Sequence, residues 1–236
     1  MANSSNNRKV FILLTILVIP SLIYVILATG KEKFAVLPVY GKRVPTYETT
    51  AEGDTLVDTI YHSIPEFAFV NQDNQPVDRS TMEGRICVSN FIFTNCQTIC
   101  PAMSESMAQV QHRFVERQDK VAFYSFTIDP ANDTPEVLAR YAIRLKAKHP
   151  QWQFLTGDQQ EIFKLAAQGF LIQAEKGDGG AEQFFHSNRL VLTDTEGRIR
   201  GMYDGTDASA VVRLTEDIRA LEFDAYLSKK NRKKKI

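Results

Sequence analysis

Apolar residues occur along this chain in two kinds of pattern, which predict buried strands and amphipathic helices. Residues 86–93 and 121–128 are almost wholly apolar, as in strands that are buried on both faces of a sheet. Between them, residues 101–118 carry apolar side chains at helical spacing and predict a helix. A strand, a helix and a second strand in this order indicate a sheet with helices on both faces.

The remaining segments add more helices and a hairpin to this unit. Asp133 or Thr134 is expected to cap the helix after the second strand, with Pro135 in its first turn. That helix is predicted over residues 134–148. The further predicted elements are an edge strand (64–70), a third short strand (152–155), a helix (158–168), a hairpin of two strands (189–194 and 199–204) and a last helix (207–227). This order is that of a thioredoxin-like fold of the α/β class.

A segment of 19 residues without charge, from Val10 to Ala28, precedes these elements. At about 1.5 Å per helical residue it matches the ~30 Å hydrocarbon layer of a bilayer. It therefore predicts one N-terminal transmembrane helix. A cleaved signal peptide is the alternative, although its apolar region is usually only ~7 to 15 residues long.

The anchor sets the expected organisation and location of the chain. The predicted segments are a short cytoplasmic tail (residues 1–9), the transmembrane anchor (10–28), a tether (29–59), the thioredoxin-like domain (60–228) and a basic tail (229–236). The chain is then a single-pass protein of the inner (cytoplasmic) membrane. Its domain faces the periplasm or another extracytoplasmic space, where disulfides persist.

The charges are distributed unevenly, although the formal net charge of the chain is zero. Residues 44–228 contain 16 Lys or Arg and 27 Asp or Glu, a net charge of −11. Such an acidic domain argues against binding to nucleic acid, which needs a basic face. The basic tail is expected to be solvated, or else attracted to anionic lipid.

Candidate chemistry is concentrated at Cys96 and Cys100, which follow the first buried strand, and at His186 far downstream. Two thiols and one imidazole can bind a soft metal ion, form a reversible disulfide, or do both. Pro101 keeps Cys100 from helical backbone angles, so both sulfurs are expected at a helix N-terminus, which lowers a thiol pKa. Asp129 follows the neighbouring strand, so these side chains are expected to converge at the carboxyl ends of the strands.

The donor types narrow the choice of metal without settling the chemistry. Three soft-leaning donors suit copper and could accept zinc, whereas calcium and magnesium prefer oxygen ligands. Structural zinc normally has four protein ligands, which disfavours a zinc finger. A redox disulfide needs only the cysteines, although the usual redox motif has two intervening residues and this one has three.

The segments Cys96-Gln97-Thr98-Ile99-Cys100-Pro101 and Asp129-Pro130-Ala131-Asn132-Asp133-Thr134, with the distant His186, resemble the SCO/SenC family of copper-binding, thioredoxin-fold assembly proteins. The resemblance covers roughly residues 60–227 and includes the anchor. It implies that Cys96, Cys100 and His186 ligate copper. It also implies metallation or thiol reduction of the dinuclear copper centre of cytochrome c oxidase, with the copper-bearing subunit of the oxidase, or another copper protein, as partner.

One departure from the family pattern concerns the cysteine loop. The family often has Pro-Asp where this chain has Gln97-Thr98, so a carboxylate is missing there. Asp129 is the nearest candidate to supply negative charge behind the ligands. The glycine-rich residues 176–180 are expected to form a mobile loop before His186.

The resulting hypothesis is a membrane-tethered copper chaperone. The alternative is a thiol-disulfide oxidoreductase with Cys96 and Cys100 as its redox pair, so enzymatic activity stays open. A non-catalytic scaffold domain is a third hypothesis, because a fold does not determine a function. A peroxidase is disfavoured, because Phe93 stands where such enzymes have a threonine before the reactive cysteine. Cys87 is expected to be a core residue, as are Met103 and Met107.

Overall fold

The computed structural model describes residues 4–29, 36–49, 55–97, 99–172 and 187–234. The chain divides into two compact units, residues 1–36 and 37–236. The first unit contains one helix, α1 (Ser4–Thr29), whose described side chains include many exposed apolar ones. Within the described ranges, no helix combines the length and the apolar character that crossing a bilayer requires. The predicted helix is therefore present, but the predicted membrane span over residues 10–28 is not confirmed.

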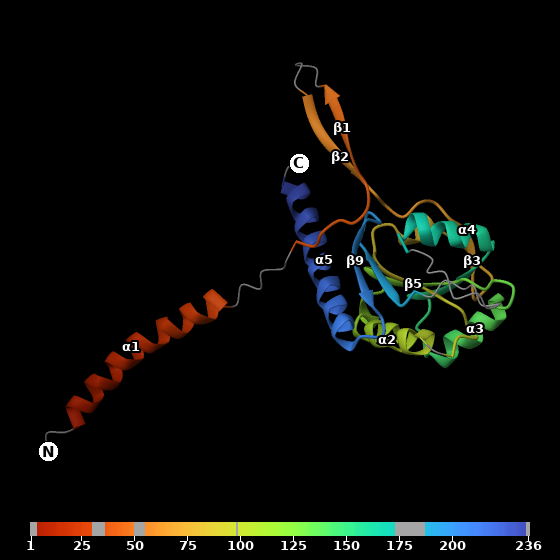
Figure 1. Ribbon diagram of the computed structural model, residues 1–236. Helices are drawn as coiled ribbons and strands as arrows, with labels where there is room; N and C mark the ends of the chain where they lie inside the picture. The colour runs from red at the N-terminus through yellow and green to blue at the C-terminus, as the bar shows by residue number, and fades with distance from the viewer. Residues whose placement is uncertain (1–3, 30–35, 50–54, 98, 173–186, 235–236) are drawn as a thin grey trace. The chain divides into compact units, whose positions relative to one another are not determined.

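The second unit is built on a seven-stranded mixed sheet with the order β4-β3-β7-β6-β5-β8-β9 (Figure 1). Its strands are β3 (Ala68–Asn71), β4 (Pro76–Asp78), β5 (Ile86–Ile92), β6 (Val121–Thr127), β7 (Trp152–Thr156), β8 (Arg189–Thr193) and β9 (Ile199–Asp204). The central strands β5, β6 and β7 are parallel, whereas β3 and β8 pair antiparallel with β7 and β5. The fold class is thus confirmed as α/β and thioredoxin-like.

Helices cover both faces of this sheet, as predicted (Figure 1). The helices are α2 (Ile99–Arg113), α3 (Pro135–Arg144), α4 (Gln159–Lys164) and α5 (Ala208–Lys234), with short helical turns at Arg79–Met82, Val115–Arg117 and Leu165–Gly169. One apolar cluster packs α2, α3 and α5 against the sheet, and a second packs α4 against the other face. Met103 and Met107 are fully buried in the first cluster and Cys87 in the second, which confirms them as core residues.

The predicted edge strand is interior to the sheet. The segment predicted over residues 64–70 forms β3 at Ala68–Asn71, with Pro65 before it, and the short strand β4 occupies the edge instead. A proline has no N–H to donate to a neighbouring strand, so the strand begins only after it. Three residues of β4 are too few to give a periodic signal in the sequence.

The segment predicted as a tether over residues 29–59 contains regular structure. Strands β1 (Arg43–Thr49) and β2 (Thr55–Tyr61) pair antiparallel as a separate two-stranded sheet. Their β-branched and aromatic residues favour extended backbone. The sequence did not predict this pair of strands, and the role of residues 29–59 as a tether stays a prediction.

The basic tail is also more ordered than predicted. Helix α5 continues to Lys234, so it passes through most of residues 229–236 instead of ending near residue 227. Lys and Arg are good helix formers, and cations at a helix C-terminus interact favourably with its dipole. The backbone of this tail is therefore an extension of the last helix.

Candidate functional site

Cys96 and Cys100 lie where the chain leaves β5 and enters α2. Cys96 is in the connecting loop, where its N–H donates to the carbonyl of Phe93 (3.2 Å). Cys100 is the second residue of α2, and its N–H points at the sulfur of Cys96 (3.5 Å). The Cys96 sulfur thus occupies the position of a cap on the first helical turn. The two thiols are brought together by the backbone, as the sequence predicted.

Burial is the largest influence on the pKa of the Cys100 thiol. The Cys96 and Cys100 side chains are 8% and 3% exposed. Burial raises the pKa of the Cys100 thiol to about 12, and the neighbouring Cys96 and Asp133 add to the rise, although a backbone hydrogen bond from Phe93 acts against it. The predicted downward shift was wrong for Cys100, whose thiol is raised in pKa by the loss of water, and for Cys96 it stays a prediction.

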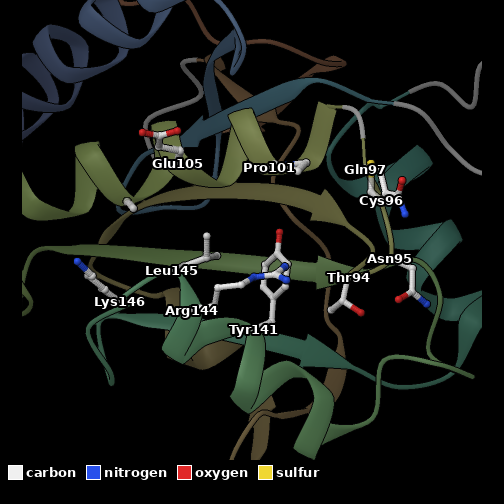
Figure 2. Close-up of a pocket in the computed structure, with 11 residues that line it drawn as sticks. Thr94, Asn95, Cys96, Gln97, Pro101, Glu105, Tyr141, Arg144, Leu145 and Lys146 are labelled. Carbon is white, nitrogen blue, oxygen red and sulfur yellow. The ribbon is translucent and has the colours of Figure 1, made fainter.

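A pocket of about 830 Å³ opens beside Cys96, between α2 and α3 (Figure 2). Cys96 lines this pocket and Cys100 does not, so the two thiols differ in access. Figure 2 shows Tyr141 and Arg144 of α3 in the middle of the pocket and the loop residues Thr94 to Gln97 at one end. A molecule in the pocket would meet Cys96 first.

The buried carboxylate of Asp133 holds the cysteine loop onto the sheet. It accepts hydrogen bonds from the backbone N–H of Thr94 (3.1 Å) and from its hydroxyl (2.5 Å). It also accepts one from the hydroxyl of Thr127 at the end of β6 (2.5 Å). Charge-assisted bonds of this kind are the strongest that neutral donors make in proteins. Asp133 therefore fixes the start of the loop against the neighbouring strand.

Asp133 is a site residue whose role the sequence analysis missed. The sequence offered it as one of two candidate helix caps and left a further role open, but Thr134 is the N-cap of α3, and its hydroxyl accepts a hydrogen bond from the backbone N–H of Val137 (3.4 Å). The sequence held one sign of this role. Because Thr134 can cap the helix, the neighbouring Asp133 carboxylate is free to accept hydrogen bonds from elsewhere.

Asp129 follows β6 as predicted, and its contacts are local. Its side chain accepts a hydrogen bond from Asn132 (2.8 Å), and its backbone N–H donates to the hydroxyl of Thr127 (3.0 Å). Its carbonyl accepts from the backbone of Asp133 (2.9 Å). These contacts account for Asp129 as a turn residue, and a role behind metal ligands stays a prediction.

The third predicted ligand, His186, lies outside the described residues, as do Thr98 and the glycine-rich residues 176–180. Among the side chains that the structure describes, no three His, Cys, Asp or Glu form a group that could hold a metal ion. Two of the three predicted ligands are thus adjacent, and the ligand set stays a prediction.

Comparison with known proteins gives a consistent result. The family model described as SCO1/SenC matches residues 59–221. The SCO1 protein homolog of Bacillus subtilis (strain 168) is 30% identical over 169 residues, which are 71% of this chain and 87% of that protein. A protein of Stutzerimonas stutzeri named a putative copper-binding protein is 30% identical over 141 residues, 59% of this chain and 68% of its own length.

A solved structure agrees in fold. The structure of BsSco, described as a member of the Sco family of cytochrome c oxidase assembly proteins with a disulfide switch, is 30% identical and superposes with a TM-score of 0.59. The match covers 68% of this chain and 93% of that one.

Proposed function

The chain belongs to the SCO1/SenC family, and from that premise we propose that it binds copper through Cys96, Cys100 and His186 and helps to assemble the copper centre of cytochrome c oxidase. The observation that carries the proposal is the contact between the Cys100 N–H and the Cys96 sulfur at the edge of an open pocket. The copper-binding name of one relative and the assembly role stated for another support it.

The residues of the loop suit copper as a cargo that is taken up and released. Thiolates are soft ligands that favour Cu(I), and ligation requires each thiol to lose its proton. The raised pKa of Cys100 keeps its thiol protonated until a cation replaces the proton. Asp133 orients the loop without occupying a ligand position, and the pocket gives an acceptor access to Cys96.

The second candidate function is thiol-disulfide exchange with partner cysteines. Its support is that Cys96 borders the pocket while Cys100 lies just behind it, an arrangement in which one thiol attacks and the other resolves. The disulfide switch named for BsSco agrees with it. Only the reduced pair can bind copper, so a molecule cannot hold the copper ion and the disulfide at the same time.

Attachment of the domain to a membrane through residues 10–28 is part of the proposal, with the domain on the extracytoplasmic side. It is supported by the 19 uncharged residues from Val10 to Ala28 and by exposed apolar side chains in α1, such as Phe11 and Leu17. Alkaline extraction of membranes from expressing cells checks it. The full chain should stay in the membrane fraction, and a chain without residues 1–28 should not.

Copper titration of the full chain in nonionic detergent tests the central proposal. The reduced protein should bind one Cu(I) per chain, and the oxidised protein none. His186→Ala should weaken binding, whereas His149→Ala, a histidine paired with Asp73 on the surface, should leave it unchanged. Equal affinity of the two variants would remove His186 from the ligand set, and retention of thiol exchange without copper binding would favour the second function.

A further inference from the structure

A second pocket, of about 670 Å³, lies next to the pocket beside Cys96. The two share the lining residues Glu105, Ala108, Leu145 and Lys146. They therefore form one continuous depression between α2 and the C-terminal end of α3, which we call the α2–α3 groove. Cys96 lines one end of it.

Most of the charged residues that line the α2–α3 groove are cations. Arg113, Arg144, Lys146 and Lys148 line it, and Glu105 is the one carboxylate among its described lining residues. None of the four cations has an ion-pair partner within the part of the chain that the structure describes. Their charge is thus available to a ligand.

This cationic groove contrasts with the rest of the domain. Residues 44–228 have a net charge of −11, yet residues 137–157 contain no Asp or Glu. An extended polyanion such as nucleic acid or an anionic bilayer would also be exposed to the net negative charge of the rest of the domain and be repelled. A short anionic segment that fits within the groove would be attracted without that cost.

The fixed parts of the groove suit a peptide. The Arg144 guanidinium lies over the Tyr141 ring, 4.8 Å from its centroid, and the Tyr141 hydroxyl is hydrogen-bonded to Ser104 (2.9 Å). Arg144 is therefore held in a defined position, which lowers the entropy lost when it binds a carboxylate. The partly buried Ala108 and Leu145 offer apolar surface between the cations. A segment that carries both acidic and apolar side chains matches this lining.

We propose that the α2–α3 groove is the docking site for an acidic peptide segment of the protein that receives copper from, or delivers it to, Cys96. The inference rests on the proposed function and names the chemistry of the partner. A segment held in the groove keeps its own metal ligands near Cys96 and raises their effective concentration there. Its charge also speeds the encounter in a salt-dependent way.

Peptide binding to the reduced full chain in nonionic detergent tests this proposal. The probe is a fluorescein-labelled glutamate-rich peptide that contains one leucine, followed by fluorescence anisotropy. The test variant is R144E/K146E/K148E, and the matched control reverses three exposed cations outside the groove, K42E/K164E/R219E. The wild type and the control should bind alike, and the groove variant at least about ten-fold more weakly. Binding should weaken as salt is added.

Other outcomes overturn the docking site while leaving the proposed function open to its own test. Equal binding by both variants, no binding to the wild type, or binding only to phosphatidylglycerol vesicles would each contradict an acidic peptide in the groove. Copper affinity is measured on the same samples, so loss of copper binding by the wild type would count against the proposed function alone. If the charge-reversal variant is unfolded, the neutral variant K146Q/K148Q should still weaken peptide binding at least about three-fold.

Discussion

Cys87 and Cys100 have similar burial and different surroundings. Both are almost completely buried, and burial raises the pKa of each thiol to about 12. Cys87 lies within β5, where its sulfur is within weak hydrogen-bond distance of the carbonyls of Met82 (3.7 Å) and Arg85 (3.6 Å). Cys100 lies behind the sulfur of Cys96, at the edge of a pocket. Burial and thiol pKa therefore do not distinguish a cysteine of the core from a cysteine of the site. The two are distinguished by how close they lie to a pocket and by which groups contact their sulfur atoms.

The contacts that hold the Cys96 loop in place also differ from those around Cys87. The loop that carries Cys96 is held by two hydrogen bonds from Thr94 to the Asp133 carboxylate, and a third, from Thr127, ties that carboxylate to β6. Cys87 is held by apolar packing in the second core cluster. Apolar packing keeps the Cys87 thiol inert. The hydrogen bonds to the Asp133 carboxylate, which we call the Asp133 clamp, keep the irregular Cys96 loop in one geometry next to the pocket.

The largest difference should appear in copper binding. Cys96→Ser and Cys100→Ser each remove one soft ligand and should lower Cu(I) affinity at least about 1,000-fold in a competition titration. Cys87→Ser, the matched change in the same strand–loop–helix unit, should leave the affinity within about two-fold of the wild type, at the cost of some stability. Comparable losses for all three would erase the distinction between core and site.

Alkylation should separate the same thiols by access. In the native, reduced protein, iodoacetamide should modify Cys96 at least about 100-fold faster than Cys87, because Cys96 lines a pocket whereas Cys87 is fully buried. Mass spectrometry of digested samples gives the rate for each cysteine. Unfolding in urea should make the rates similar, and a fast native rate at Cys87 would show that β5 opens readily.

The Asp133 clamp should be worth about 3 kcal/mol of folding free energy. Asp133→Asn removes the charge and turns an amide donor toward hydroxyl and N–H donors, so buried groups lose their partners. Asp129→Asn is the matched control, because its side chain accepts one hydrogen bond, from Asn132. Urea unfolding measures both, and equal destabilisation would mean that the clamp is an ordinary turn contact.

The smallest predicted effect is the response of Cys87 to alkali. Its folded pKa of about 12 lies above its ordinary value of 9.0, so the stability it contributes is complete below pH 9 and is lost as pH rises toward 12. Between about pH 8 and pH 10.5 the wild type should lose about 2 kcal/mol more than Cys87→Ala. Urea unfolding at the two pH values measures this, and equal losses would mean that Cys87 does not keep its proton through burial.

The strands around the site were predictable from sequence because each is a nearly uninterrupted apolar run. Burial on both faces imposes that pattern on β5 and β6, and Pro101 marks the entrance of α2. The adjacency of Cys96 and Cys100 follows from their position in one connection, so it needed no knowledge of distant contacts.

What the sequence did not predict depends on contacts between distant segments. The direction of the Cys100 pKa shift depends on burial beneath the folded chain, and the role of Asp133 depends on Thr94, which is 39 residues away in the chain. The hairpin of β1 and β2, which pairs residues 43–49 with residues 55–61, was also missed. The α2–α3 groove is lined by two helices that are separate in the sequence, so the sequence does not reveal that they lie side by side. The absence of acidic residues over 137–157 was the one sign of it in the sequence.

X-ray absorption at the copper edge of the Cu(I)-loaded full chain tests the central claim most directly. The account predicts a first shell of two sulfur ligands and one imidazole nitrogen, with one sulfur lost in Cys96→Ser or Cys100→Ser and the nitrogen lost in His186→Ala. Cys87→Ser should give the wild-type spectrum. A first shell without sulfur, or one that changes in Cys87→Ser and not in Cys100→Ser, would contradict it.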